Sequence, residues 1–164
     1  MGFDMTNFTL LHVAIGLAAI GSGVIILIGL LTGKRLDGWT PFFLATTVLT
    51  SVTGFGFPFE RLLPSHIIGG LSLVILAVAI FARYVRKLAG GWRRTYVITA
   101  ISAFYLNVFV LIVQIFLNVP ALKAIAPTQS EAPFLLTQLI VLTVFVVLGF
   151  LATNRFREKP DSTA

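Results

Sequence analysis

Residues 8–32 read FTLLHVAIGLAAIGSGVIILIGLLT and contain no charged side chain. An α-helix needs about 20 predominantly apolar residues to cross the roughly 30 Å hydrocarbon core of a bilayer. Within lipid every backbone N–H and C=O must find a partner in the protein, which a helix provides and an open strand does not. The stretch therefore predicts a transmembrane helix.

Four further apolar stretches follow along the chain, at residues 41–57, 64–84, 96–119 and 133–153. Of the 164 residues, 57% are hydrophobic and only 11% are charged. A soluble domain of this size could not enclose so much apolar surface in one core. The sequence predicts an all-α, polytopic membrane protein, in which residues 1–164 form a single bundle of five transmembrane helices.

The basic residues are distributed unevenly between the loops of this predicted bundle. Only Arg61 and Lys123 fall on the side of the N-terminus. The other ten of the 12 fall on the opposite side: Lys34, Arg35, Arg83, Arg86, Lys87, Arg93, Arg94, Arg155, Arg157 and Lys159. Loops rich in Lys and Arg face the cytoplasm. We therefore expect a bacterial inner-membrane protein with its N-terminus outside and its C-terminus in the cytoplasm. Contact with the lipid bilayer then explains the net charge of +6, so nucleic acid is not expected as a partner.

The first two predicted helices resemble the next two in sequence. The corresponding pairs are HVAIGL (12–17) with HIIGGL (66–71) and KRLDGW (34–39) with RKLAGGW (86–92). The histidine, the glycine and the loop motif recur in the same order. We predict a tandem repeat of two helical hairpins, about residues 8–57 and 62–119, related by a pseudo-twofold axis along the membrane normal. The fifth helix, about residues 133–153, lies outside the repeat.

His12 and His66 are the only histidines in the chain. Each lies near the outer start of its helix, so both are expected at the same depth, near the outer leaflet. We expect them to face inward, because an imidazole in lipid is costly. Gly16 and Gly70 lie one helical turn below them. We interpret the missing side chains as a slot for a flat cofactor, with His12 and His66 as the axial ligands of one haem b.

Other uses of the two histidines stay open: a different metal ion, proton transfer, quinone binding or hydrogen-bonded packing. A closed zinc site is not expected, because the chain has no Cys and no carboxylate within a predicted helix. Arg61 could neutralise haem propionates or simply extend to the membrane surface. Gln114 and Gln138 could bond the imidazoles or join helices.

In these features the chain resembles the small membrane-bound b-type cytochromes, which are helical bundles with histidine ligands on different helices beside small residues. The resemblance covers the neighbourhoods of His12 and His66. Members of that family with two haems carry four ligand histidines, so the resemblance implies one haem here. The chain also looks like other small bacterial multi-span proteins, a likeness that implies no particular chemistry.

The sequence thus favours a haem protein that transfers single electrons near the outer leaflet, to a redox partner or a quinone. The first alternative is a carrier or channel for a small solute along the repeat axis. The second is a structural subunit of a larger complex, with another membrane protein as its partner. The sequence contains no Walker loop, dinucleotide fingerprint, nucleophile elbow or zinc-protease helix, and it leaves open whether the protein is an enzyme.

Overall fold

The computed structural model describes residues 5–57 and 64–157, and every regular element in these ranges is helical. In chain order the elements are α1 (Met5–Leu31), α2 (Trp39–Gly54), α3 (Pro64–Ile80), the π-helical turn η1 (Phe81–Val85) that continues α3, α4 (Gly91–Asn118), the short α5 (Pro120–Ile125) and α6 (Ala132–Arg155). Pro120 and Pro133 lie in the first turn of their helices, where the missing N–H breaks no helical hydrogen bond.

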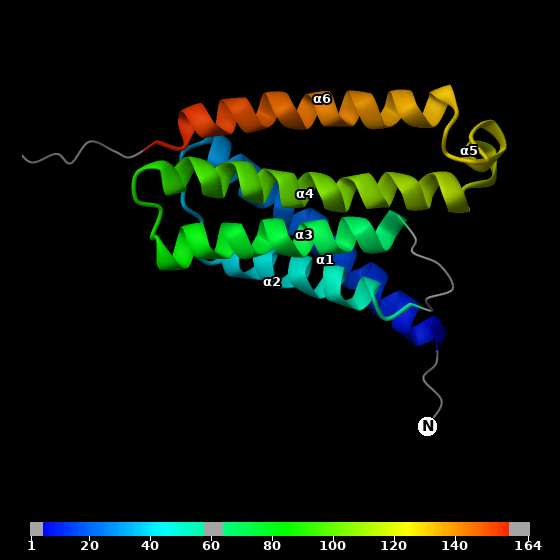
Figure 1. Ribbon diagram of the computed structural model, residues 1–164, viewed down its shortest axis with the longest axis horizontal. Helices are drawn as coiled ribbons and strands as arrows, with labels where there is room; N and C mark the ends of the chain where they lie inside the picture. Colours follow the sequence, from blue (N-terminus) through cyan, green and yellow to red (C-terminus); the bar gives the residue numbers. More distant parts are fainter. Residues whose placement is uncertain (1–4, 58–63, 158–164) are drawn as a thin grey trace, which may run out of the picture.

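The long helices lie side by side and run alternately in opposite directions (Figure 1). α1 packs against α2 and α4, and α3 packs against the same two helices. α1 and α3 therefore occupy opposite corners of a four-helix arrangement. α6 packs on the outside of this arrangement, against α4 and α1.

Four segments of the described chain are long and apolar enough to cross a membrane: Met5–Leu31, His66–Val85, Gly91–Asn118 and Ala132–Arg155. By length and composition the chain is a multi-pass helical membrane protein. The remaining long helix, α2, has 16 residues, a length of about 24 Å at the usual rise per residue. This is shorter than the hydrocarbon core of a typical bilayer.

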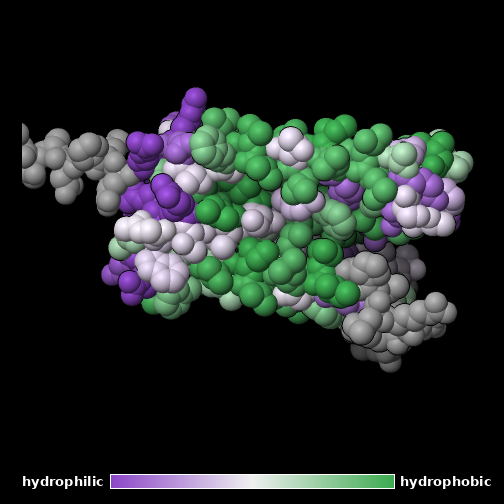
Figure 2. Space-filling model, turned by 45° about the horizontal axis from the view of Figure 1, so that its top comes forward, coloured by the Kyte–Doolittle hydropathy of each residue, from purple (hydrophilic) through white to green (hydrophobic). Residues whose placement is uncertain are grey.

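The surface of the protein is likewise divided into apolar and polar regions. Figure 2 shows hydrophilic residues gathered at the two ends of the molecule and a broad hydrophobic band between them. We call the end that carries the α1–α2 and η1–α4 loops and the C-terminus of α6 the basic end. The opposite end carries the N-terminal ends of α1 and α3, and we call it the histidine end.

The tightly packed core lies near the basic end. It is formed by Ile26, Leu30, Phe43, Leu44, Leu76, Ala79, Ala82, Leu88, Tyr96, Val97, Ala100, Ile101, Ala103, Phe104, Ala152 and Phe156. A second, smaller cluster, formed by Phe116, Ala126 and Phe134, lies at the opposite end of α4. Large apolar residues are exposed along the length of the bundle, for example Leu10 on α1 and Phe150 on α6.

The two loop motifs share one unusual backbone feature and differ in another, because Lys87 also has a positive φ, of 49°, and its counterpart Arg35 does not. Leu36 has a φ of 37° and Leu88 a φ of 60°, a region that costs an L-residue roughly 1–2 kcal/mol. Leu88 belongs to the core and Leu36 packs against it, so burial of the side chains offsets the strain. The likeness at these two leucines is local, and the superposition of the two hairpins stays a prediction.

Candidate functional site

His12 lies on α1, where it is half-buried. Its Nδ1 is 2.7 Å from Oγ1 of Thr53, near the end of α2. The Thr53 hydroxyl donates its single hydrogen to the carbonyl oxygen of Leu49, at 2.7 Å, so its oxygen accepts from the imidazole. Neutral His12 therefore carries its proton on Nδ1, and Nε2 keeps its lone pair for a ligand or a proton.

His66 lies on α3 and is buried, with 5% of its surface exposed. Its ring packs against the ring of Phe55, the residue that follows α2, with the ring centres 5.8 Å apart. Phe57 packs edge-on against His12, with the ring centres 5.2 Å apart. Two neighbouring aromatic residues at the end of α2 therefore cover the two imidazoles.

Both histidines lie at the histidine end, because each is close to the N-terminus of its helix and α1 and α3 run in the same direction (Figure 1). Closer to the basic end, Nδ2 of Asn107 on α4 donates a hydrogen bond of 3.3 Å to Oγ1 of Thr47 on α2. This bond joins α2 to α4, the helices at the other two corners of the four-helix arrangement. Both histidines contact the segment that follows this bond along the chain, at and just after the end of α2.

Gly16 and Gly70, predicted to leave a slot for a cofactor, have different surroundings. A Cβ added to Gly16 would lie 3.6 Å from Cγ2 of Thr50, which is an ordinary contact. A Cβ added to Gly70 would meet no atom within 4 Å. Open space therefore lies beside Gly70, while Thr50 already occupies the space beside Gly16. The two glycines predicted to be equivalent therefore have unequal surroundings.

The two predicted glutamines form hydrogen bonds away from the histidines. Gln114 is exposed on α4, and its Oε1 accepts from Nδ2 of Asn118 at 3.2 Å. Gln138 is buried on α6, where its Nε2 donates to the carbonyl oxygen of Phe109 at 3.3 Å and its Oε1 has no hydrogen-bond partner among the described residues. Gln138 thus joins α6 to α4. Arg61 lies outside the described residues.

A second polar site, which the sequence analysis missed, lies at the basic end. Arg83 in η1 is 5% exposed. Its Nη2 donates to the carboxylate of Asp37 at 2.5 Å and to the carbonyl oxygen of Arg35 at 3.1 Å. The guanidinium carbon lies 5.2 Å from the ring centre of Tyr96 and 5.9 Å from that of Tyr84. The side chain holds the α1–α2 loop against α3 and α4.

Arg83 was grouped with the basic residues of a loop, but the structure places it inside the protein. A π-helical turn inserts one extra residue into a helix and often occurs where a side chain has a special role. The sequence offered two signals for this site. Arg83 interrupts an apolar run, and Asp37 is an acidic residue of the first loop motif at the position where the second motif has Ala89. The sequence alone does not show that Arg83 pairs with Asp37, because 46 residues separate them.

The fold and these two sites define a multi-pass helical membrane protein with a pair of histidines at one end and a buried arginine at the other. Comparison of the chain with protein-family models, with curated proteins and with solved structures gives no match. What the protein does is therefore inferred from its own residues.

Proposed function

We propose that the chain is a membrane-embedded b-type haem protein that transfers single electrons near one surface of the bilayer. His12 and His66 would be the axial ligands of one haem, and a redox protein or a quinone would exchange the electron. The observation that supports this most is the pair of imidazoles at one end of the bundle, on opposite corner helices, both in contact with the end of α2. Haem in helical bundles is commonly bound by side chains of facing helices.

The surrounding residues suit this role. Thr53 is bonded to the backbone of its own helix and holds the His12 ring through Nδ1, which orients Nε2 as the donor atom. Phe55 and Phe57 pack against the imidazoles, and apolar neighbours tune the potential of a bound redox group. When bound, the haem supplies the one-electron chemistry.

The ligand set also favours haem over a metal ion held by side chains alone. Such a site needs several converging ligands, and no group of three or more His, Cys, Asp or Glu side chains converges within residues 5–57 and 64–157. A haem iron takes four of its ligands from the porphyrin and needs only two from the protein. Two histidines are therefore sufficient for a haem and too few for a closed metal site.

We also propose that α2 crosses the membrane as a fifth span. α1 and α3 run in the same direction, so the chain must return across the bundle between them, and α2 is the segment that returns (Figure 1). Phe55 and Phe57 lie beyond the end of α2 and extend its apolar length, and Trp39 at its start is a residue typical of membrane interfaces. Local thinning of the bilayer can accommodate the remaining difference.

The orientation and the repeat belong to the same proposal. The excess of Lys and Arg at the basic end favours a cytoplasmic basic end and an external histidine end in a bacterial inner membrane. The hairpins α1–α2 and α3–α4 would be related by a half-turn about the membrane normal. The shared conformation at Leu36 and Leu88 supports this relation.

Absorption spectroscopy of protein purified from haem-replete cells tests the haem assignment. We expect a Soret band and a reduced spectrum typical of low-spin, six-coordinate iron. His12→Ala and His66→Ala should each abolish or convert this spectrum. Thr53→Val, which keeps the shape of the side chain and removes the hydroxyl, should shift the spectrum or the reduction potential without preventing folding, because the ring loses its orienting bond.

Gln138→Leu is the matched control, because it changes a buried polar residue whose described hydrogen bond goes to Phe109 rather than to a histidine. The spectrum of this variant should stay nearly unchanged. A folded, monodisperse and colourless protein would contradict the proposal. A coloured protein that is indifferent to both histidine substitutions would show that the cofactor lies elsewhere and that the assigned site is wrong.

A further inference from the structure

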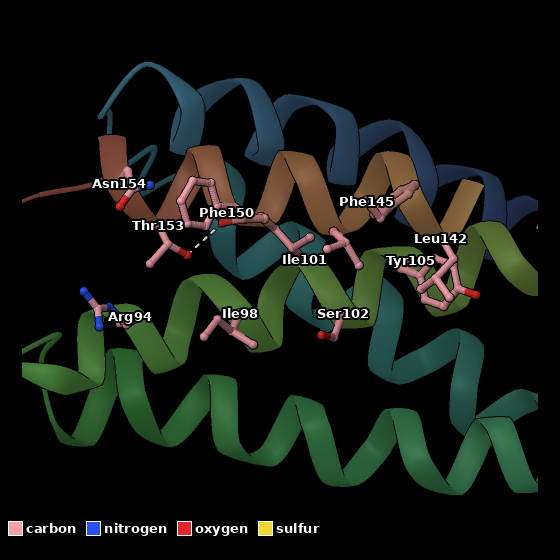
Figure 3. Close-up of a pocket in the computed structure, with 12 residues that line it drawn as sticks. Arg94, Ile98, Ile101, Ser102, Tyr105, Leu142, Phe145, Phe150, Thr153 and Asn154 are labelled. Carbon is pink, nitrogen blue, oxygen red and sulfur yellow. Dashed lines mark hydrogen bonds between the residues drawn. The ribbon is translucent and has the colours of Figure 1, made fainter. Parts of the chain in front are cut away.

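A groove of about 460 Å³ lies between α4 and α6, away from the histidines. Its walls are mainly apolar, with Ile98 and Ile101 on α4 and Leu142 and Phe150 on α6 (Figure 3). Gly149 lies on the α6 wall, and a Cβ added there would be in ordinary contact with Cγ2 of Ile101 on the α4 wall, at 3.8 Å. A larger side chain at this position would therefore extend into the groove.

The groove has one polar end. Arg94 and Asn154 line it where α4 begins and α6 approaches its C-terminus, so this end lies at the basic end of the bundle (Figure 3). Arg94 is exposed. The two ion pairs described for residues 5–57 and 64–157 both use Asp37, with Arg35 and with Arg83. The charge of Arg94 is thus not neutralised by a described acidic residue.

We propose that this groove binds one acyl chain of an anionic glycerophospholipid, with the lipid phosphate held by Arg94 and Asn154. The distance along α4 from Arg94 to Tyr105, the two ends of its groove lining, is about 16 Å at the usual helical rise. This matches about half of the hydrocarbon thickness, the depth that one leaflet provides. A cation at the interfacial end of an apolar groove between helices is the arrangement that recognises anionic lipid head groups.

A lipid fits these features better than a free phosphate does. A free anion would contact only the polar end, whereas a lipid also covers the apolar walls. The proposal does not depend on the haem assignment, because the groove shares no residue with the histidine end.

Native mass spectrometry of the detergent-solubilised protein can test the site, through titration with phosphatidylglycerol and with phosphatidylcholine that carries the same acyl chains. Both lipids carry a phosphate, but the choline cation of phosphatidylcholine makes its head group neutral overall. We therefore expect phosphatidylglycerol to bind about fivefold more tightly, since one interfacial cation is worth about that factor toward a net negative charge. Arg94→Gln should bring the ratio of the two dissociation constants close to one. Lys87→Gln, which removes a charge from the same end but does not line the groove, should leave the ratio unchanged.

Gly149→Leu tests the acyl chain separately, because the added side chain fills the groove without altering Arg94. It should weaken the binding of both lipids severalfold, and circular dichroism and gel filtration would check that the variant is folded. Equal affinities in the unaltered protein, or a preference that persists in Arg94→Gln, would overturn the head-group assignment. Unchanged binding in Gly149→Leu, or equal competition by glycerophosphoglycerol without acyl chains, would overturn the groove as a lipid site.

Discussion

Arg83 is the single residue whose surroundings most restrict its replacement. Removing a guanidinium from water is costly, and the protein offsets this cost with one carboxylate, one carbonyl oxygen and two aromatic rings. Nη1 has no hydrogen-bond partner among the described residues, so the compensation is incomplete. Loss of Asp37 would leave a buried cation with no described anionic partner.

A double-mutant cycle measures this dependence. We expect Asp37→Asn to lower the free energy of unfolding by about 2 kcal/mol, less than for a fully buried pair because the Asp37 side chain is 74% exposed. In an Arg83→Met background the same substitution should cost little, because no buried charge is left behind. Thermal unfolding in detergent gives both values. Additive effects of the two substitutions would show that the pair is not coupled.

At the scale of the helices, the contact between α1 and α4 depends on the absence of a side chain. Gly23 is buried on α1, and a Cβ added there would lie 2.5 Å from Cδ2 of Phe104 on α4. The Phe104 ring is itself held between Phe43 and Phe145, at 6.5 Å and 5.1 Å between ring centres. It has little freedom to move aside, so α1 and α4 would have to separate.

Two alanine substitutions on α1 separate this packing effect from helix propensity. Gly23→Ala should destabilise the protein by about 1–3 kcal/mol, the usual cost of overpacking. Gly21→Ala should be neutral or stabilising by up to about 1 kcal/mol, because a Cβ there meets no atom within 4 Å and Ala favours the helix. Chemical unfolding in mixed micelles provides the comparison. Equal effects of the two substitutions would contradict the close contact at Gly23.

The first and last residues of the helices, compared with the predicted bounds, show how far the local sequence determines these helices. Apolar composition predicted a helix over 96–119, and the structure begins α4 at Gly91, because a helix can continue past the membrane surface and carry charged residues there. The prediction over 64–84 did not include a π-helical turn, which is associated with the burial of Arg83. α5 was not expected, since six residues are too few for a periodic pattern.

At the scale of the whole molecule, composition and charge predicted a helical, multi-pass membrane protein, because those properties decide whether a chain belongs in lipid. The pairing of Arg83 with Asp37 and the groove beside Gly149 depend on contacts between distant segments, and no local pattern encodes them. The surroundings of Gly16 and Gly70 likewise depend on Thr50 of another helix. The sequence could therefore name candidate ligands but not the space around them.

The number of spans can be decided by topology mapping, because four and five spans place the loops on different sides. With α2 as a span, the loop after α1 and the loop before α4 lie on the same side of the membrane. Without it they lie on opposite sides. The chain has no Cys, so Lys34→Cys, Ala89→Cys and Ala124→Cys each introduce a unique thiol at an exposed position.

We expect a membrane-impermeant maleimide to label Ala124→Cys in intact cells, and to label Lys34→Cys and Ala89→Cys only after permeabilisation. This outcome follows from five spans and a cytoplasmic basic end, where Lys and Arg are concentrated. Labelling of all three only after permeabilisation would contradict the alternation of the helices. Labelling of Lys34→Cys and Ala89→Cys from opposite sides would show that α2 does not cross. In that case α1 and α3 would cross the bilayer in opposite directions, so they could not run parallel as they do in the structure. His12 and His66 would then lie at opposite surfaces of the membrane and could not bind one haem.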